Sequence, residues 1–326
     1  MTDAGVTVGL LGDVMLGRMV AGRLEHEPPG VVWSEGVAEH LRSCDAVICN
    51  LECCISDRGR ETRRIRGKPF FFRAPPQAVE SLATVRIAGV SLANNHALDF
   101  ETEALEDALD LLGAAGVAVT GAGRSVESAR RGAVIEVGDT KLGLLGVTDH
   151  PAEYAAGDDS AGVAWAELHG ALPAWIEGEL RRLRAEADLV VAFPHWGANM
   201  TTGPTHWQKQ RARELIAAGA DLVAGHSAHL FHGVERVEGR LVLYDLGDAL
   251  DDYRIDPVLR NDLGVLALWR PGAEPELELV GLHLDYCETE LAHGREADWI
   301  AVRLGQACRQ LGTRVERLGE QWFAII

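Results

Sequence analysis

The feature that most constrains this chain is a set of short apolar segments, each followed at once by a residue able to bind a metal ion. The residues in these positions are Asp13, Glu52, Asn95 with His96, His195, and His226 with His229. Apolar runs of this length are typical of buried strands. In an open α/β sheet the carboxyl ends of such strands meet at one ligand crevice. We therefore expect five separate strand ends to bring these side chains together.

Between these positions, apolar runs alternate with amphipathic helical stretches, which predicts a layered α/β protein. Helices are predicted over residues 77–85, 102–115, 172–187, 207–218 and 297–311. Strands are predicted over 6–11, 45–49, 87–92, 189–193, 221–224, 265–269 and 277–284, with hairpins over 133–147 and 234–244. No Pro/Ser-rich linker and no repeat of fixed period interrupts the sequence. We expect a single domain over residues 1–326, with the helix at 297–311 packed on it.

Charge and hydropathy exclude two classes of partner. The formal net charge is −18, which repels phosphate backbones and argues against nucleic acid. No window reaches the length of apolar sequence that a membrane span needs, and the N-terminus lacks the basic region of a signal peptide. We expect a cytoplasmic protein. In that compartment thiols stay reduced, so all six cysteines are interpreted as structural.

The types of the candidate ligands indicate which ions they bind. Carboxylates, imidazoles and an amide oxygen suit one or two divalent ions, and they do not discriminate among Mn, Zn, Fe, Co, Ca and Mg. A lone histidine after a strand is more often a hydrogen-bonded structural residue than a ligand. Five convergent strand ends are much harder to obtain by chance.

Several motifs occur in a consistent order along the chain. They are Gly12–Arg18 (GDVMLGR), Asn50–Glu52 (NLE), Phe72–Pro76 (FRAPP), Ser91–Asp99 (SLANNHALD), His195–Gly197 (HWG) and Gly225–His229 (GHSAH). Together, over roughly residues 5–270, they resemble the CapA (poly-γ-glutamate capsule protein) family of the calcineurin-like metallophosphoesterase superfamily. The resemblance implies an α/β fold in which two packed mixed β-sheets are flanked by helices, with a two-metal centre at the strand ends.

The resemblance also implies roles for the candidate residues. Asp13 and Glu52 match carboxylates at the metals, Asn95 and His195 match ligands of the second metal, and His226 and His229 match the closing histidine pair. His96 matches the histidine that acts as an acid near the leaving group. The chain departs from the superfamily at Met15, where a histidine is usual, and in the three-residue spacing of its closing pair. These departures weaken the expectation of a full second ion site and of phosphate chemistry.

Three functions are compatible with these observations. The first, which we favour, is a metal-dependent peptide epimerase that inverts an α-carbon, because the chain resembles a soluble branch that includes the lasso-peptide epimerases. Its substrate would be a peptide, such as a ribosomal precursor, and the metal would stabilise an enolate. Asp13, His96 and His293 are then the candidate proton carriers. The alternatives are a metal-dependent phosphoesterase and a capsule poly-γ-glutamate biosynthesis factor without catalysis.

Residues outside the ligand motifs are interpreted with less support. Arg18, Arg73 and Trp196 are the candidate substrate-binding residues, although the arginine-rich stretch that ends at Arg73 also fits a solvated loop. Asp245 or Asp248 is expected either to orient a metal-bound histidine or to cap a turn. His150 is expected at the surface.

Overall fold

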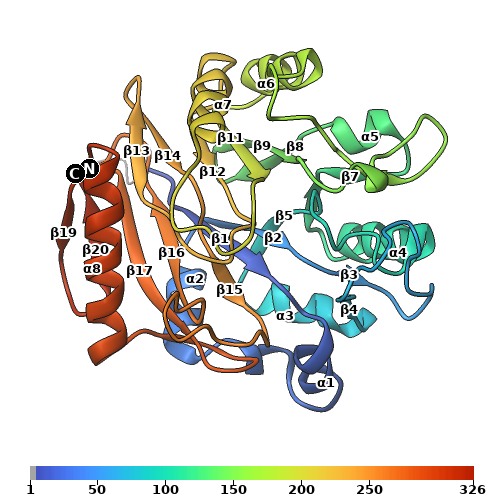
Figure 1. Ribbon diagram of the computed structural model, residues 1–326, viewed down its shortest axis with the longest axis horizontal. Helices are drawn as coiled ribbons and strands as arrows, with labels where there is room; N and C mark the ends of the chain where they lie inside the picture. The colour runs from blue at the N-terminus through green and yellow to red at the C-terminus, as the bar shows by residue number, and fades with distance from the viewer. Residues whose placement is uncertain (1–4) are drawn as a thin grey trace.

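The computed structural model describes residues 5–326, which form two mixed β-sheets packed face to face with helices on their outer faces (Figure 1). This arrangement confirms the predicted fold class. The helices are α1 (Arg18–His26), α2 (Glu35–Ser43), α3 (Val79–Thr84), α4 (Glu101–Ala114), α5 (Val126–Arg130), α6 (Ala174–Glu186), α7 (His206–Ala217) and α8 (Gly294–Gln310).

The larger sheet has ten strands, in the order β19-β20-β17-β16-β1-β2-β5-β6, with β15 beside β1 and β18 beside β17. The bounds are β1 (Val8–Val14), β2 (Ala46–Leu51), β5 (Ile87–Ser91), β6 (Ala118–Thr120), β15 (Asp248–Leu250), β16 (Leu263–Trp269), β17 (Leu277–Leu284), β18 (Thr289–Leu291), β19 (Val315–Arg317) and β20 (Trp322–Ile325). Strands β1, β2, β5 and β6 run parallel, whereas β16 runs antiparallel to β1.

The smaller sheet has six strands, in the order β13-β14-β12-β11-β9-β8. Its strands are β8 (Ala133–Val137), β9 (Thr140–Thr148), β11 (Leu189–His195), β12 (Leu222–Ala224), β13 (Val234–Val237) and β14 (Arg240–Leu243). Two short ribbons complete the strands: β3 (Cys54–Ile55) with β4 (Arg73–Ala74), and β7 (Ala122–Gly123) with β10 (Gly162–Val163).

Three buried apolar clusters hold the sheets and helices together as layers. One lies between the sheets and joins Leu10 and Ile48 to Phe193. A second lies between the larger sheet and helices α1–α4, and a third lies between the smaller sheet and helices α6 and α7. Helix α8 adds Ile300 and Leu304 to the first cluster and contacts β13, β16, β17 and β19. The central strands of both sheets, such as β1, β2 and β11, are therefore buried on both sides, as their near-continuous apolar runs predict.

The structure differs from the prediction chiefly at the strand ends and in the terminal segments. Strand β1 continues through Asp13, which lies opposite Asn50 of β2 and Asp248 of β15. Strand β11 likewise continues to His195 through its parallel pairing with β9. Helices α1 and α2 and strands β18–β20 were not predicted. Their sequences are short or mixed in polarity, so only packing against the sheet defines them.

Candidate metal centre

The predicted convergence of the strand ends is confirmed at the carboxyl edge of both sheets. Two groups of potential ligands form there, each with its ligand atoms within 4.8 Å of one another. The first group is Asp13, His195 and His226, and the second is Asp13, Glu52, His229 and Asp248. Asp13 belongs to both. A carboxylate shared by two ligand groups is compatible with a two-ion centre, in which the ions lie close enough to share a ligand.

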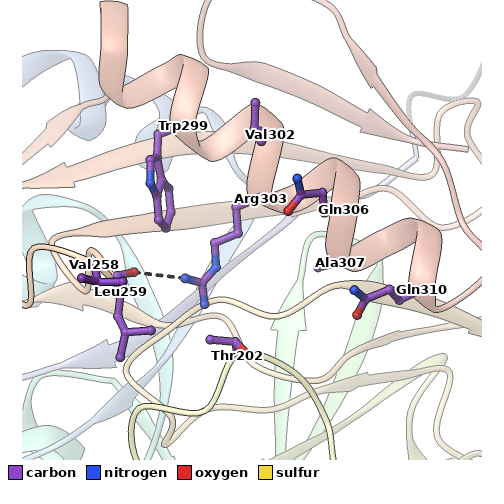
Figure 2. A pocket seen from close by; sticks show the side chains of 9 residues that line it. All are labelled: Thr202, Val258, Leu259, Trp299, Val302, Arg303, Gln306, Ala307 and Gln310. Carbon is purple, nitrogen blue, oxygen red and sulfur yellow. Dashed lines mark hydrogen bonds between the residues drawn. The ribbon is translucent and has the colours of Figure 1, made fainter.

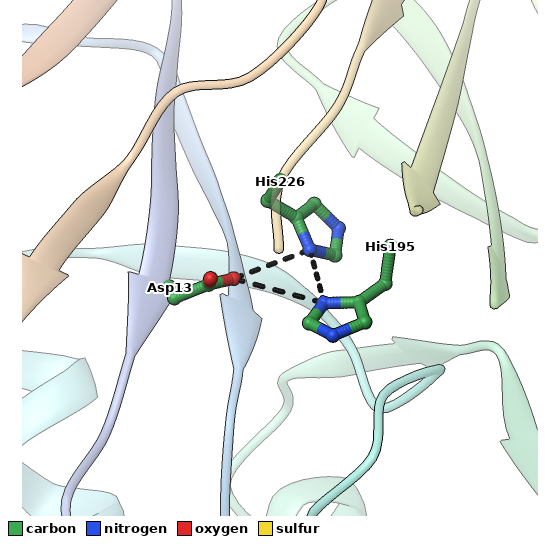
Figure 3. A group of neighbouring side chains, drawn as sticks. All are labelled: Asp13, His195 and His226. Atoms are coloured by element: carbon green, nitrogen blue, oxygen red, sulfur yellow. Dashed lines mark hydrogen bonds and ion pairs between the residues drawn. The ribbon is translucent and has the colours of Figure 1, made fainter. Parts of the chain in front are cut away.

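The first group consists of one carboxylate and two imidazoles (Figure 3). His226 Nδ1 lies 3.2 Å from Asp13 Oδ1 and 2.9 Å from His195 Nδ1. His195 Nε2 lies 3.1 Å from Asn95 Oδ1, and since this amide oxygen can only accept, Nε2 carries the proton. The lone pair of His195 Nδ1 therefore points toward Asp13 and His226. Asn95 thus lies at the centre beside His195, and its role as a direct metal ligand stays a prediction.

The second group is richer in carboxylates. His229 Nδ1 lies 2.8 Å from Asp248 Oδ1 and 3.7 Å from Asp13 Oδ2. The Tyr253 hydroxyl donates to Glu52 Oε2 at 3.1 Å. Asp248 was expected to support a ligand, and the structure places it among the ligands themselves. Its position could not be read from the sequence, because an Asp after a glycine is equally typical of a turn cap.

Unpartnered atoms test whether these residues fit a cation. Asp13 Oδ2, Glu52 Oε1 and Asp248 Oδ2 are buried without a hydrogen-bond partner, and so is His226 Nε2. Buried oxygens of this kind are costly unless something satisfies them, and a divalent cation satisfies several at once. The donor set of carboxylate oxygens and imidazoles suits Mn, Zn, Fe or Co. The residues present therefore fit a divalent metal.

The pKa values of the buried carboxylates depend on their burial and on one another's charge. Burial raises the pKa of Glu52 well above its ordinary range, and the negative charge of Asp13 raises it further. The pKa of Asp248 rises for the same two reasons. Burial, the largest single effect, acts in the same direction on Asp13. Hydrogen bonds from His226 and Asn50 and the charges of His226 and His229 together outweigh it and lower the pKa of Asp13. Asp13 is thus the group best held as an anion before a metal binds.

Glycine and asparagine residues position Asp13. Asn50 Nδ2 donates to Asp13 Oδ1 at 2.8 Å, and Asn94 in turn donates to Asn50 Oδ1 at 3.0 Å. A Cβ atom on Gly12 would lie 1.9 Å from the carbonyl oxygen of Gly247. Only glycine therefore lets β1 approach the turn that leads into β15. This close approach is what brings Asp248 to the centre.

His96 lies at the mouth of the centre and is held by Asp99. Its Nδ1 is 2.6 Å from Asp99 Oδ2, so Nδ1 carries the proton that the carboxylate accepts. Lys68 and Tyr154 fix Asp99 from the other side, each 3.1 Å from its Oδ1. Burial lowers the pKa of His96 to about 4, with Asp99 opposing the shift. Stacking on Phe72 completes the orientation, with ring centroids 3.8 Å apart.

A cavity of about 300 Å³ opens beside the centre. Its lining consists of Arg18, Phe70, Phe72, His96, Asn199, Met200, His229, Tyr253, Arg254 and Asn261. The lining thus combines two cationic side chains, two asparagines and three aromatic rings with His96 and His229. The guanidinium of Arg18 lies over the rings of Phe70 and Phe72 and 3.3 Å from Asp252. Arg18 thus lines the cavity beside the centre, and its role in binding a substrate stays a prediction.

Three predicted site residues lie elsewhere. His293 is exposed, directly precedes α8, and pairs with Glu320 at 3.2 Å. Trp196 is fully buried, and its indole nitrogen donates to the carbonyl oxygen of Tyr244 at 2.9 Å, so it offers no face to a substrate. Arg73 stacks on Phe100 at 4.2 Å and does not line the cavity. In each case a partner distant in sequence satisfies the side chain.

Two arginines of the basic segment before Arg73 form ion pairs with α4. Arg58 pairs with Asp107, and Arg64 pairs with Glu101 at 3.0 Å. His150, by contrast, was expected at the surface and lies beside the centre. Its ring centroid is 5.2 Å from that of His195, and it pairs with Asp149. The preceding strand β9, which ends at Thr148, was the available sequence signal for this position.

The fold and the two ligand groups define an α/β protein with a candidate metal centre at its strand ends. The family model described as bacterial capsule synthesis protein PGA_cap matches residues 7–253. The chain therefore belongs to this family. The CapA resemblance is confirmed, whereas placement beside the lasso-peptide epimerases stays a prediction. Within residues 5–326, no helix combines the length and apolarity needed to cross a membrane.

Two relatives and one solved structure illustrate the similarity. A probable polyglutamine synthesis accessory protein of Mycobacterium tuberculosis is 29% identical, over 95% of this chain and 93% of its own. The PGA biosynthesis protein CapA of Bacillus subtilis is 26% identical, over 77% of this chain and 64% of its own. A 5'-nucleotidase from Candida albicans covers 96% of this chain and 60% of its own at 10% identity and a TM-score of 0.46. That structural similarity is too low to support an argument about function.

Proposed function

We propose that this chain is a metal-dependent hydrolase that cleaves a phosphoester in the metabolism of a capsule polyglutamate. The observation that carries the proposal is the position of Asp13 in two ligand groups at once. Two-ion centres of this kind recur in enzymes that displace a leaving group at phosphorus. The similarity to a probable polyglutamine synthesis accessory protein and to a PGA biosynthesis protein supports the metabolic setting.

When bound, the metal would supply Lewis acidity and an activated water. The residues of the chain would supply the rest. Asp13, His195 and His226 would hold one ion, and Asp13, Glu52, His229 and Asp248 the other. Because Asp99 accepts the Nδ1 proton of His96, the Nε2 atom of His96 is free to exchange a proton with a group in the cavity. This makes His96 the proposed acid–base residue.

The cavity wall supports an anionic substrate. Arg18 and Arg254 are both part of the lining, and guanidinium groups bind phosphate and carboxylate oxygens through paired hydrogen bonds. The exposed ring of Phe70 lies at the same wall and could cover an apolar part of the substrate. The sequence predicts a peptidic substrate. Its phosphoester would lie at the metal centre, and the rest of the peptide would lie along the cavity wall at Phe70.

Epimerisation is the less favoured reaction. It needs one proton carrier on each face of an α-carbon. Asp13 and His96 remain as candidates, but the third, His293, forms an exposed pair with Glu320. No contact in the cavity favours abstraction of a carbon-bound proton over hydrolysis.

The test is hydrolysis of p-nitrophenyl phosphate and bis(p-nitrophenyl) phosphate by the full chain loaded with Mn²⁺ or Zn²⁺. His96→Gln should lower kcat by roughly 10²–10⁴-fold, as for loss of an acid–base residue, while metal content stays unchanged. His293→Asn is the matched control and should retain full activity. A parallel incubation of peptides in heavy water detects exchange of an α-hydrogen. Deuterium incorporation without any phosphoester cleavage would refute hydrolysis and support epimerisation.

A further inference from the structure

A second cavity, of about 330 Å³, lies between α8 and two loops and is separate from the metal centre. Its lining consists of Thr202, Val258, Leu259, Trp299, Val302, Arg303, Gln306, Ala307 and Gln310 (Figure 2). This volume is within the range of small-molecule sites in proteins. None of these residues belongs to the candidate metal centre.

The unusual member of this lining is Arg303. Figure 2 shows its side chain extending from α8 toward the loop at Val258 and Leu259, with Thr202 close by. Nη1 donates to the carbonyl oxygen of Leu259 at 3.0 Å, whereas Nη2 is buried with no hydrogen-bond partner. Arg303 forms no ion pair with any residue of the described range 5–326. In a chain with a net charge of −18, a half-buried guanidinium without an anion is unexpected.

Two aromatic rings fix the guanidinium in place. It lies 5.2 Å from the ring centre of Trp299 and 5.1 Å from that of Phe231. These contacts hold the charge at one wall of the cavity, and an ordered cation binds an anion with little loss of conformational entropy. Burial lowers the pKa of Arg303, an effect that the negative charge of Asp245 opposes. An anionic ligand would stabilise the charged form in the same way.

The rest of the lining combines polar and apolar groups. Trp299, Arg303, Gln306 and Gln310 recur at intervals of three and four residues and therefore share one face of α8. The two amides can donate hydrogen bonds to oxygens beside the guanidinium. Val258 of the facing loop and Val302 of α8 are 79% and 60% exposed, so the cavity also offers apolar surface beside these polar groups.

We infer that this α8 cavity binds a carboxylate that carries an apolar substituent. The carboxylate meets the guanidinium of Arg303, and the substituent covers Val258, Val302 and the ring of Trp299. A single cation flanked by neutral amides matches one negative charge. A phosphate dianion would leave a negative charge uncompensated in a strongly acidic protein.

The loops of this cavity also form part of the wall beside the metal centre. One loop contributes Thr202 to the α8 cavity and Met200 to the cavity beside the metal centre. The other loop contributes Leu259 to the α8 cavity and Arg254 to the cavity beside the metal centre. A ligand on α8 would therefore contact the backs of both loops. The inference itself rests on Arg303 and does not depend on the proposed hydrolysis.

Isothermal titration calorimetry with two matched ligands tests it. N-acetyl-L-leucine carries a carboxylate and an apolar arm, whereas N-acetyl-L-leucinamide lacks only the charge. The acid should bind roughly tenfold or more tighter than the amide, as expected of a charge-assisted hydrogen bond. Acetyl-Leu-Glu-Leu-amide carries a carboxylate only on its glutamate side chain. Its binding shows whether the carboxylate that the cavity binds can belong to a peptide side chain or must belong to a free acid.

Arg303→Gln should remove the preference for the acid, whereas Arg309→Gln, an exposed arginine on the same helix, should preserve it. Arg303 also donates a hydrogen bond to the backbone of Leu259, so Arg303→Gln could lose binding because the loop shifts. A second variant that keeps this hydrogen bond separates the two causes. Gln306→Glu places a carboxylate one turn from Arg303 at an exposed position and should weaken acid binding by roughly tenfold. Equal binding of the acid and the amide, or an acid preference that survives both variants, would overturn the inference.

Discussion

Replacing Asp13 by asparagine tests whether this carboxylate is a ligand shared by two metal ions, as its position in both ligand groups indicates. Asparagine has nearly the same shape, and its Oδ1 can still accept from Asn50 Nδ2 at the 2.8 Å distance of the native pair. The metal-free fold should therefore survive. What the variant loses is the negative charge that both ligand groups share. Both ions should consequently be lost together.

The magnitude follows from binding thermodynamics. An ion present at about one hundred times its Kd stabilises the folded state by about 2.7 kcal/mol. At about 2.1 cal/mol/K of unfolding entropy per residue, the 326 residues give about 0.7 kcal/mol/K. Each ion then raises Tm by about 4 °C, and two raise it by about 8 °C. Glu52→Gln removes a ligand from one group only and should leave about half of that increase.

Differential scanning fluorimetry, with and without Mn²⁺ after treatment with a chelator, measures these shifts, and elemental analysis counts the bound ions. Asp13→Asn should show a shift below about 2 °C. Asp110→Asn, at an exposed position on α4, should behave as the native chain. If Asp13→Asn keeps the full shift, Asp13 is not a ligand. If Glu52→Gln loses the whole shift, the two groups hold a single ion.

Two further predictions concern the core and the thiols. Gly12→Ala should lower the stability of the fold by roughly 1–3 kcal/mol, because the added methyl group overlaps the carbonyl oxygen of Gly247 and forces β1 away from β15. Urea unfolding measures this, and an unchanged midpoint would contradict the close approach. Burial raises the pKa of Cys44 and Cys287 to about 11, so their thiols stay neutral at pH 8. Ellman's reagent at pH 8 should leave all six buried cysteines unmodified until denaturant is added, and any fast native reaction would contradict that burial.

The sequence alone determined the architecture and most of the metal centre. Apolar runs that end in Asp13, Glu52, His195 and His226 predict strands, and parallel strands necessarily bring their carboxyl ends to one edge. Within each sheet, convergence is therefore a consequence of the pattern, whereas the packing of the two sheets brings Asp13 of one sheet to His195 and His226 of the other. The same reasoning located His96 at the mouth of the centre.

The tertiary structure decided which way individual side chains face and what satisfies them. His293 and Trp196 look like site residues in sequence, but Glu320 and Tyr244 bind them outside the cavity. Asp248 reaches the centre because β15 pairs with β1. Gly12 of β1 permits this pairing, since it leaves room for the carbonyl oxygen of Gly247 just before β15. These outcomes depend on contacts between residues far apart along the chain. Local sequence carries no information about such contacts, because a side chain takes whichever partner the packed fold supplies.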